Sequence, residues 1–231
     1  MNNIVQDCPC ISCMDRSIPV SVLSEKELEI FCNNSVKIFF QKGERIIKQG
    51  TFSSNITFIK SGIFKMHING PLNRDEILKI GKGPAFIGIP DVFVSRTHNY
   101  SVSALTNTDA CFIDFEGFSY LIENNGQFAT EILKTLSYDL LDHFSRCVHK
   151  TQKQLTAFLA EALLFFMDTI YESDEFEIPL TRSEFGAYIG TTRETITKII
   201  HDFTKDKIIE VNGKSILILN KNILQKISNT G

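Results

Sequence analysis

The segment at residues 181–200, TRSEFGAYIGTTRETITKII, constrains the fold more than any other part of the chain. It contains two short helical patterns on either side of a glycine, which supplies the backbone freedom that a tight turn needs. Thr181 and Glu184 have the spacing of a capping box, so we expect a first helix to begin there. Thr191 and Glu194 repeat this spacing, which predicts the start of a second helix.

The second helical pattern has an apolar side and a polar side. The apolar side is formed by Ile196, Ile199 and Ile200. The opposite side carries groups that reach away from a core, namely Arg193, Glu194, Thr197 and Lys198. Two helices with polar groups near the start of the second predict a helix-turn-helix, whose second helix fits the DNA major groove. From this segment alone, an amphipathic hairpin in which Glu194 only caps its own helix stays open.

The residues that follow favour the helix-turn-helix. Apolar runs at 208–211 and 215–219 flank the pair Asn212-Gly213. Asn-Gly between two apolar runs is a strong hairpin signal, because both turn residues take a positive φ. Two helices followed by a β-hairpin predict a winged helix.

The composition is that of an ordinary globular protein. The 231 residues are 43% hydrophobic and 22% charged, and this length favours two domains. The chain shows neither a long uncharged apolar run nor a basic-then-apolar leader, so we expect a cytoplasmic protein with no membrane partner. The net charge is −3, yet from Thr181 onward Lys and Arg outnumber Asp and Glu by eight to five. This small excess predicts weak nonspecific DNA binding, with specificity depending on the recognition helix and on dimerisation.

Residues 36–118 carry short β-rich runs separated by glycines. Runs of about five residues, with a turn signal roughly every ten residues, indicate a sandwich or barrel. The clearest runs are Val36–Phe40, Ile56–Ile59, Ile63–Ile68, Ile77–Ile80, Ser101–Leu105 and Cys111–Phe115. Before them, Ser24 and Glu27 form another capping box, which predicts a short helix ending near Cys32.

Residues 125–150 predict one long helix. Apolar side chains recur at intervals of three and four residues over about seven turns. They are Ala129, Ile132, Leu133, Leu136, Leu140, Phe144, Cys147 and Val148. A helix of this length needs a partner, and a coiled-coil-like seam with a second copy predicts a two-fold homodimer. Packing on its own barrel alone is the weaker alternative. A further helix is expected at Gln154–Tyr171.

A glycine-cornered barrel, a long helix and a winged helix, in this order, resemble the Crp/Fnr superfamily of bacterial transcription regulators. The resemblance covers nearly the whole chain. It rests on the segment at 181–200 and on Lys42–Ile46 with Gly50, Lys60–Gly62, and Gly83 with Gly88. It implies an α+β fold with a cyclic-nucleotide-binding-like β-barrel (jelly roll), a dimerisation helix and a C-terminal winged helix-turn-helix. The expected boundaries are 1–20 for a Cys-containing N-terminal arm, 21–124 for the sensory barrel, 125–151 for the dimerisation helix and 152–231 for the winged helix.

The resemblance also implies a homodimer on a palindromic double-stranded DNA operator, acting with RNA polymerase. The expected DNA-binding residues are Arg193, Glu194, Thr197, Lys198, Thr192, Thr191 and Arg182. Arg193 can donate to guanine O6 and N7, and Glu194 can accept from cytosine N4. Lys198 stands where the family usually has arginine, so a phosphate or single-acceptor contact is expected there. Thr192 and the helix N-terminus can hold a backbone phosphate.

Cyclic AMP is not expected as the effector. Cyclic-nucleotide-binding members of the family have Gly-Glu-Leu, followed by an arginine that pairs with the cyclic phosphate. Here the first motif becomes Gly88-Ile89-Pro90, and the second falls near Asn99–Ala104 with no arginine in register. Arg96 belongs to the preceding loop. A buried phosphate without a cationic partner is heavily penalised.

Four cysteines match the ligand set of the oxygen-sensing branch, which the resemblance associates with a [4Fe–4S] cluster. They are Cys8, Cys10, Cys13 and Cys111. Four thiolates are what such a cluster requires. The C-x-C-x2-C spacing is tighter than the pattern of that branch. A zinc site from the same residues, a thiol redox switch and unligated cysteines stay open as alternatives.

The sequence also bears on two other functional classes. A cupin-like enzyme would need a His/Glu metal cluster on the strands, whereas His67 and His98 are the only barrel histidines and show no H-x-H spacing. We therefore expect no enzyme. A regulator that binds a small molecule in an apolar, Phe-rich barrel pocket without a metal is the second alternative, and this activity could coexist with DNA binding.

Overall fold

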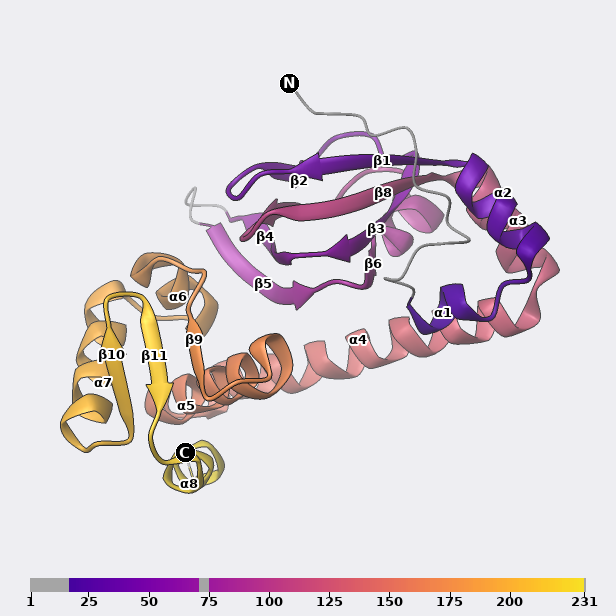
Figure 1. Cartoon of the computed structure of the whole chain (residues 1–231). Coiled ribbons are helices and arrows are strands. Elements are labelled where there is room, and N and C mark those ends of the chain that lie inside the picture. Colours follow the sequence, from indigo (N-terminus) through magenta and orange to yellow (C-terminus); the bar gives the residue numbers. More distant parts are fainter. Residues whose placement is uncertain (1–16, 71–74, 231) are drawn as a thin grey trace. The chain divides into compact units, whose positions relative to one another are not determined.

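The computed structural model describes residues 17–70 and 75–230 (Figure 1). The chain divides into two compact units, and among the described residues the first comprises 17–70 and 78–140 and the second comprises 75–77 and 141–230. Cys8, Cys10 and Cys13 lie outside the described residues. No helix in the described ranges combines the length and the apolar character that crossing a membrane requires.

The strands of the first unit form two four-stranded sheets (Figure 1). One sheet has the order β1-β8-β3-β6, formed by β1 (Ser35–Phe40), β8 (Thr108–Asp114), β3 (Asn55–Ser61) and β6 (Ala85–Ile87). The other has the order β2-β7-β4-β5, formed by β2 (Arg45–Ile47), β7 (Ser101–Ala104), β4 (Ile63–Asn69) and β5 (Asp75–Lys82). The pairs β1–β8, β3–β8, β3–β6, β2–β7 and β4–β7 are antiparallel. The predicted barrel-like sandwich is confirmed.

Each of the six predicted β-runs corresponds to one of these strands, although the run ending at Leu105 extends one residue beyond β7, and two strands were missed. β2 and β6 have three residues each, which is too short to show an alternating pattern. The run predicted to end at Phe115 is one residue too long. Asp114 accepts a hydrogen bond from the Glu116 N–H at 3.0 Å and caps an unpredicted helix, α3 (Phe115–Asn124).

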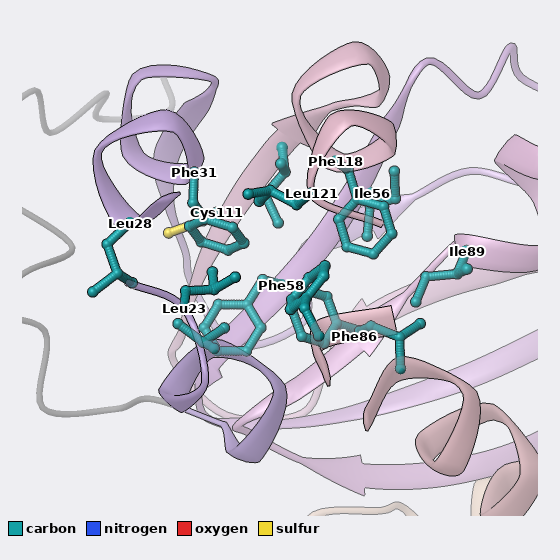
Figure 2. Close-up of a cluster of buried hydrophobic side chains, with 14 of the residues drawn as sticks. Leu23, Leu28, Phe31, Ile56, Phe58, Phe86, Ile89, Cys111, Phe118 and Leu121 are labelled. Atoms are coloured by element: carbon teal, nitrogen blue, oxygen red, sulfur yellow. The ribbon is translucent and has the colours of Figure 1, made fainter. Parts of the chain in front are cut away.

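An apolar cluster joins the short helices of the first unit to its sheet (Figure 2). The helices are α1 (Ile18–Ser21), α2 (Glu25–Asn33) and α3. The centre of the Phe58 ring lies 4.8 Å from the centre of the Phe86 ring, and the Phe86 and Phe118 ring centres are 5.8 Å apart. These phenylalanines therefore fill the core by contact with one another. The predicted start of α2 is confirmed, because the Glu27 Oε2 accepts from the Ser24 N–H at 2.8 Å.

The long helix predicted at 125–150 is α4 (Gly126–Gln152). Near its start, Phe128 and Ile132 are buried in the cluster of the first unit. Most later apolar side chains are exposed instead, namely Leu133, Tyr138, Leu140, Leu141, Phe144 and Val148. Much of the apolar surface of α4 is thus left without cover within one chain.

The second unit contains the predicted winged helix (Figure 1). After α4 it comprises α5 (Leu155–Phe165), the π-helical segment η3 (Phe166–Tyr171), β9 (Glu175–Glu177), α6 (Arg182–Ile189), α7 (Arg193–Lys205), β10 (Ile209–Asn212), β11 (Ser215–Ile218) and α8 (Lys221–Thr230). The sheet has the order β10-β11-β9 and is antiparallel. The helix at Gln154–Tyr171 is confirmed as α5 with η3, whereas β9 and α8 were not predicted.

Candidate nucleic-acid interface

The first helix of the motif, α6, is fixed at its start by the predicted capping box. The Thr181 hydroxyl accepts a hydrogen bond from the Glu184 N–H at 3.2 Å. In return, Glu184 Oε2 accepts from the Thr181 N–H at 2.8 Å. Backbone groups that a helix start would otherwise leave unbonded are thereby satisfied.

Two glycines set the turn that follows α6. Gly190 has φ +86°, a left-handed conformation that closes the helix. Gly186 faces the turn so closely that a Cβ there would lie 2.8 Å from the Thr191 carbonyl oxygen. The backbone of α6 at this position is therefore packed directly on the backbone of the turn, which only a residue without a side chain permits.

The second helix, α7, begins one residue later than the predicted Thr191–Glu194 capping box. The Thr191 N–H bonds to the Gly186 carbonyl oxygen at 2.8 Å, so Thr191 belongs to the turn that closes α6. Thr192 is the N-cap instead, and its hydroxyl accepts from the Thr195 N–H at 3.3 Å. A hydrogen bond from its own backbone N–H, and then one from Thr192, hold the pKa of Glu194 below its ordinary value.

The two sides of α7 are disposed as the sequence predicts. Ile196, Ile199 and Ile200 are buried. The polar side chains Arg193, Glu194, Thr197 and Lys198 are exposed. The Thr197 hydroxyl donates to the Arg193 carbonyl oxygen at 2.8 Å and keeps acceptor capacity. This side therefore presents donors of both arginine and lysine type next to a carboxylate acceptor, which is the chemistry that reads base edges.

A hollow of about 340 Å³ lies between the start of α6, the start of α7 and the β10–β11 turn. Three cationic side chains line it, those of Arg182, Arg193 and Lys214. No acidic residue is among its described lining. Partial burial lowers the pKa of Arg182 from its ordinary value, but a guanidinium stays protonated at neutral pH. Converging cations beside a helix start suit an anionic group such as a phosphate.

Lys214 is the residue of this hollow that sequence reasoning missed. The predicted hairpin is confirmed, but its turn lies one residue later than expected, at Gly213-Lys214, because Asn212 ends β10 and pairs with Ser215. Gly213 has the expected positive φ, +61°, whereas Asn212 does not. Lys214, next to the predicted turn residues, is visible in the sequence. Nothing local, however, indicates that the turn approaches Arg182, which lies more than thirty residues earlier in the chain.

In the first unit, the region corresponding to the cyclic-phosphate motif is occupied by a tyrosine. The Gly88 N–H donates to the Tyr100 hydroxyl at 3.1 Å. Burial and the nearby Asp91 carboxylate raise the pKa of Tyr100. Arg96 ends the π-helical segment η2 (Asp91–Ser95), and its guanidinium lies 3.8 Å from the centre of the Phe115 ring. The Arg96 guanidinium thus lies on the face of an aromatic ring, and the residue follows η2, in the loop where the sequence predicts it.

Among the expected metal ligands, only Cys111 can be placed. It lies in β8 within the apolar cluster that contains Leu28 and Phe31 (Figure 2). The two barrel histidines contact different partners. His67 Nε2 lies 3.1 Å from Ser103 Oγ, and His98 Nδ1 lies 3.4 Å from Asp91 Oδ2. Within residues 17–70 and 75–230, no three His, Cys, Asp or Glu side chains come together as a metal site.

Two known domain families match this chain, one in each compact unit. The cyclic nucleotide-binding domain family matches residues 37–125, and the Crp-like helix-turn-helix domain family matches residues 159–227. The first match covers the β-sandwich and α3. The second covers α6, α7 and the wing, where the cationic hollow and the exposed polar side of α7 lie.

Individual relatives agree with these matches. The electron transport regulator A of Shewanella oneidensis is 26% identical over 192 residues, which cover 81% of this chain and 76% of that protein. The fumarate and nitrate reduction regulatory protein of Escherichia coli is 26% identical over 228 residues, covering 96% of this chain and 89% of the relative. The fold is similar to that of FixK2 from Bradyrhizobium japonicum, with a TM-score of 0.78, 15% identity and coverage of 85% and 98% of the two chains. The two sequence relatives are named as regulators, and with both family matches they show that the chain belongs to the Crp/Fnr family of DNA-binding transcription regulators.

Proposed function

We propose that the chain acts as a homodimer that binds a palindromic DNA operator and inserts α7 of each copy into the major groove. The observation that carries this proposal is the two-sided character of α7. Its isoleucines are buried, while Arg193, Glu194, Thr197 and Lys198 stand free of the core on the other side. Bound in this way, the two half-sites lie about 34 Å apart, one turn of DNA.

In this proposal, Arg193 donates to a guanine and Glu194 accepts from a cytosine. Lys198 contacts a phosphate or a single base acceptor. Thr191, Thr192 and Arg182 hold the backbone near the starts of the two helices, where Arg182 already lines the cationic hollow. The bound protein then acts on RNA polymerase.

The test is a selection of operators from random DNA, followed by affinity measurements with variants. Arg193→Ala should weaken specific binding by roughly 1–3 kcal/mol and relax one base position in each half-site. Lys205→Ala, at the far end of the same helix, serves as the matched control. An Arg193→Ala protein that keeps its affinity and its sequence preference would refute the assignment.

Dimerisation through α4 is supported by exposed apolar side chains along that helix. Leu133, Leu140 and Phe144 are 65%, 52% and 55% exposed, and neighbouring exposed apolar side chains of this kind mark an interaction surface. Their spacing is that of a coiled-coil seam, and a second copy of the chain offers the same surface in return. Leu140→Glu should give monomers in sedimentation analysis, whereas Ser145→Glu on the other side of α4 should leave the dimer intact.

The input to the regulator is proposed to be something other than cyclic AMP. The Gly88 N–H is already bonded to Tyr100 within a buried setting, and Arg96 is stacked on Phe115. A cyclic phosphate entering here would displace the tyrosine and meet no arginine in compensation. Saturable binding of cyclic AMP in calorimetry would overturn this part of the proposal.

A redox input through Cys8, Cys10, Cys13 and Cys111 is the second part of the proposal. The support is the ligand count and the relatives named for electron transport and for fumarate and nitrate reduction. Cys111 is 8% exposed and surrounded by apolar side chains, so the described residues alone do not form a cluster site. Iron and sulfide analysis after anaerobic purification separates a [4Fe–4S] cluster from zinc or free thiols, and iron-free protein would eliminate the cluster.

A further inference from the structure

One arginine connects the second half of α4 to the helices that follow it. Residues 141–148 are exposed with a single exception, Arg146, which is half-buried. Its guanidinium donates a hydrogen bond to the Tyr188 hydroxyl at 2.5 Å and lies over the Tyr188 ring, 4.2 Å from its centre. The same guanidinium lies 5.9 Å from the centre of the Phe158 ring. Arg146 therefore joins α4 to both α5 and α6.

The tyrosine that Arg146 contacts lies directly before the turn of the helix-turn-helix. Tyr188 is buried near the end of α6, and two residues later Gly190 begins the turn that leads to α7. A second side chain of α4 reaches the same turn, because a Cβ on Gly190 would lie 3.5 Å from the Lys150 Cε. Arg146 and Lys150 are four residues apart and share one side of the helix. This side of α4 is thus held against the point where the motif turns.

The opposite side of α4 carries the apolar surface proposed to pair with a second copy. Leu140 and Phe144 are exposed there. At about 100° per residue, Arg146 projects about 200° around the helix from Phe144. The second half of α4 and the helix-turn-helix belong to the same compact unit. One side of this half-helix therefore faces the partner chain, while the other side holds the DNA-binding motif.

This arrangement bears on the spacing of the two DNA half-sites. Two recognition helices must match the rotation between half-sites as well as their separation of about 34 Å. Once one helix has bound, the link between the helices sets the effective concentration of the second at its half-site. A stiff link favours one spacing, whereas a loose link tolerates several. A planar guanidinium that both stacks and donates restricts rotation more than a point charge does.

We propose that Arg146 is a positioning residue for operator recognition. Its contact with Tyr188 holds α6 and α7 at a fixed angle to the dimer helix and so selects the spacing between the half-sites. Arg146 itself touches no base in this assignment. The inference rests on the α4 pairing and on the groove insertion of α7 in the proposed function. Loss of Arg146 leaves each half-site contact intact and removes the discrimination between spacings.

The test measures the affinity of the full chain for three duplexes. They are the selected operator, the same operator with two base pairs inserted between its half-sites, and a duplex with one half-site. Two base pairs rotate one half-site by about 70° and move it by about 7 Å. We expect the native chain to prefer the selected spacing by about tenfold or more. Arg146→Met should reduce this preference to less than about threefold and leave the half-site affinity unchanged.

The preference is a ratio of two affinities from one sample, so any unfolded fraction of a destabilised variant cancels. Tyr188→Phe keeps the ring but removes the hydrogen-bond acceptor, and it should reduce the preference in the same direction. Lys134→Met is the matched control, because this α4 cation pairs with Glu131 of the same helix. It should keep the native preference.

The outcomes separate the positioning role from the proposed function. An Arg146→Met protein that keeps the full spacing preference overturns the positioning role and leaves dimeric operator binding standing. An equal loss of affinity for all three duplexes also overturns that role, since lower stability alone accounts for it. A native chain that sediments as a monomer, or that shows no spacing preference, overturns the proposed dimeric binding and this inference with it.

Discussion

The guanidinium of Arg146 donates a hydrogen bond to the Tyr188 hydroxyl at 2.5 Å and also lies over the Tyr188 ring, 4.2 Å from its centre. This contact joins α4 to α6, the first helix of the helix-turn-helix. Burial raises the pKa of Tyr188, and the Arg146 charge partly opposes that effect. The end of the long helix is therefore tied to the DNA-binding motif by a charge-assisted hydrogen bond and a cation–π contact.

Removing the Tyr188 hydroxyl should weaken the second unit. Tyr188→Phe leaves the Arg146 donor without its acceptor, and we expect a loss of about 1.5 kcal/mol in the free energy of unfolding. Urea unfolding followed by circular dichroism measures this. Tyr138→Phe is the matched control, because the Tyr138 side chain is exposed on α4. Equal losses in the two variants would contradict a specific role for the Arg146–Tyr188 contact.

Gly186 should not tolerate a side chain. A Cβ at this position meets the Thr191 carbonyl oxygen at 2.8 Å, so Gly186→Ala must push α6 away from the turn. We expect a destabilisation of about 1–3 kcal/mol and a matching loss of operator affinity. Gly126→Ala is the control, since nothing lies within 4 Å of its Cβ position and alanine favours a helix. Thermal unfolding of both variants measures the difference in stability. A Gly186→Ala protein as stable as the native chain would argue against this packing.

Lys214 should contribute to DNA affinity without reading sequence. If the cationic hollow holds a phosphate, Lys214→Ala weakens binding to all sequences alike and reduces the slope of log affinity against log salt by about 1. Fluorescence anisotropy at several salt concentrations measures both quantities. Lys221→Ala removes a lysine that pairs with Asp168 and does not line the hollow, so it should change neither. A change in base preference at Lys214→Ala would instead place this side chain in a groove.

The capping box of α2 should make stability depend on acid pH. Hydrogen bonds from the Ser24 hydroxyl and N–H, with a smaller one from Asn125, hold the pKa of Glu27 below its ordinary value of 4.5. A lowered pKa contributes stability above the unfolded value, and this contribution is lost as the pH falls through the folded value. The stability difference between the native chain and Glu27→Gln should therefore be constant at neutral pH and shrink below about pH 4.5.

Unfolding measured over this pH range tests the assignment. Glu29→Gln, on the exposed side of the same helix, is the control and should show no such loss. A stability difference that persists unchanged into strong acid would show that the Glu27 effect does not depend on its charge.

Local hydrogen bonding explains why some elements could be predicted from the sequence. The helix starts at Ser24 and Thr181 and the hairpin between β10 and β11 each depend on residues within three or four positions of one another. The seven-turn periodicity of α4 is likewise contained in its own segment. These features determined the order of barrel, long helix and winged helix, and with it the family.

Other features depended on contacts between distant residues, and only the tertiary structure decided them. Strands β2, β6 and β9 are three residues each and exist because longer strands pair with them. The start of α7 moved to Thr192 because Gly186 captures the Thr191 N–H. Lys214 joins Arg182, and Arg146 meets Tyr188, across separations that no local pattern records. The sequence thus determined the elements and their order, because helices and turns form from neighbouring groups. The fold decided which side chains share a site, because that depends on how those elements pack.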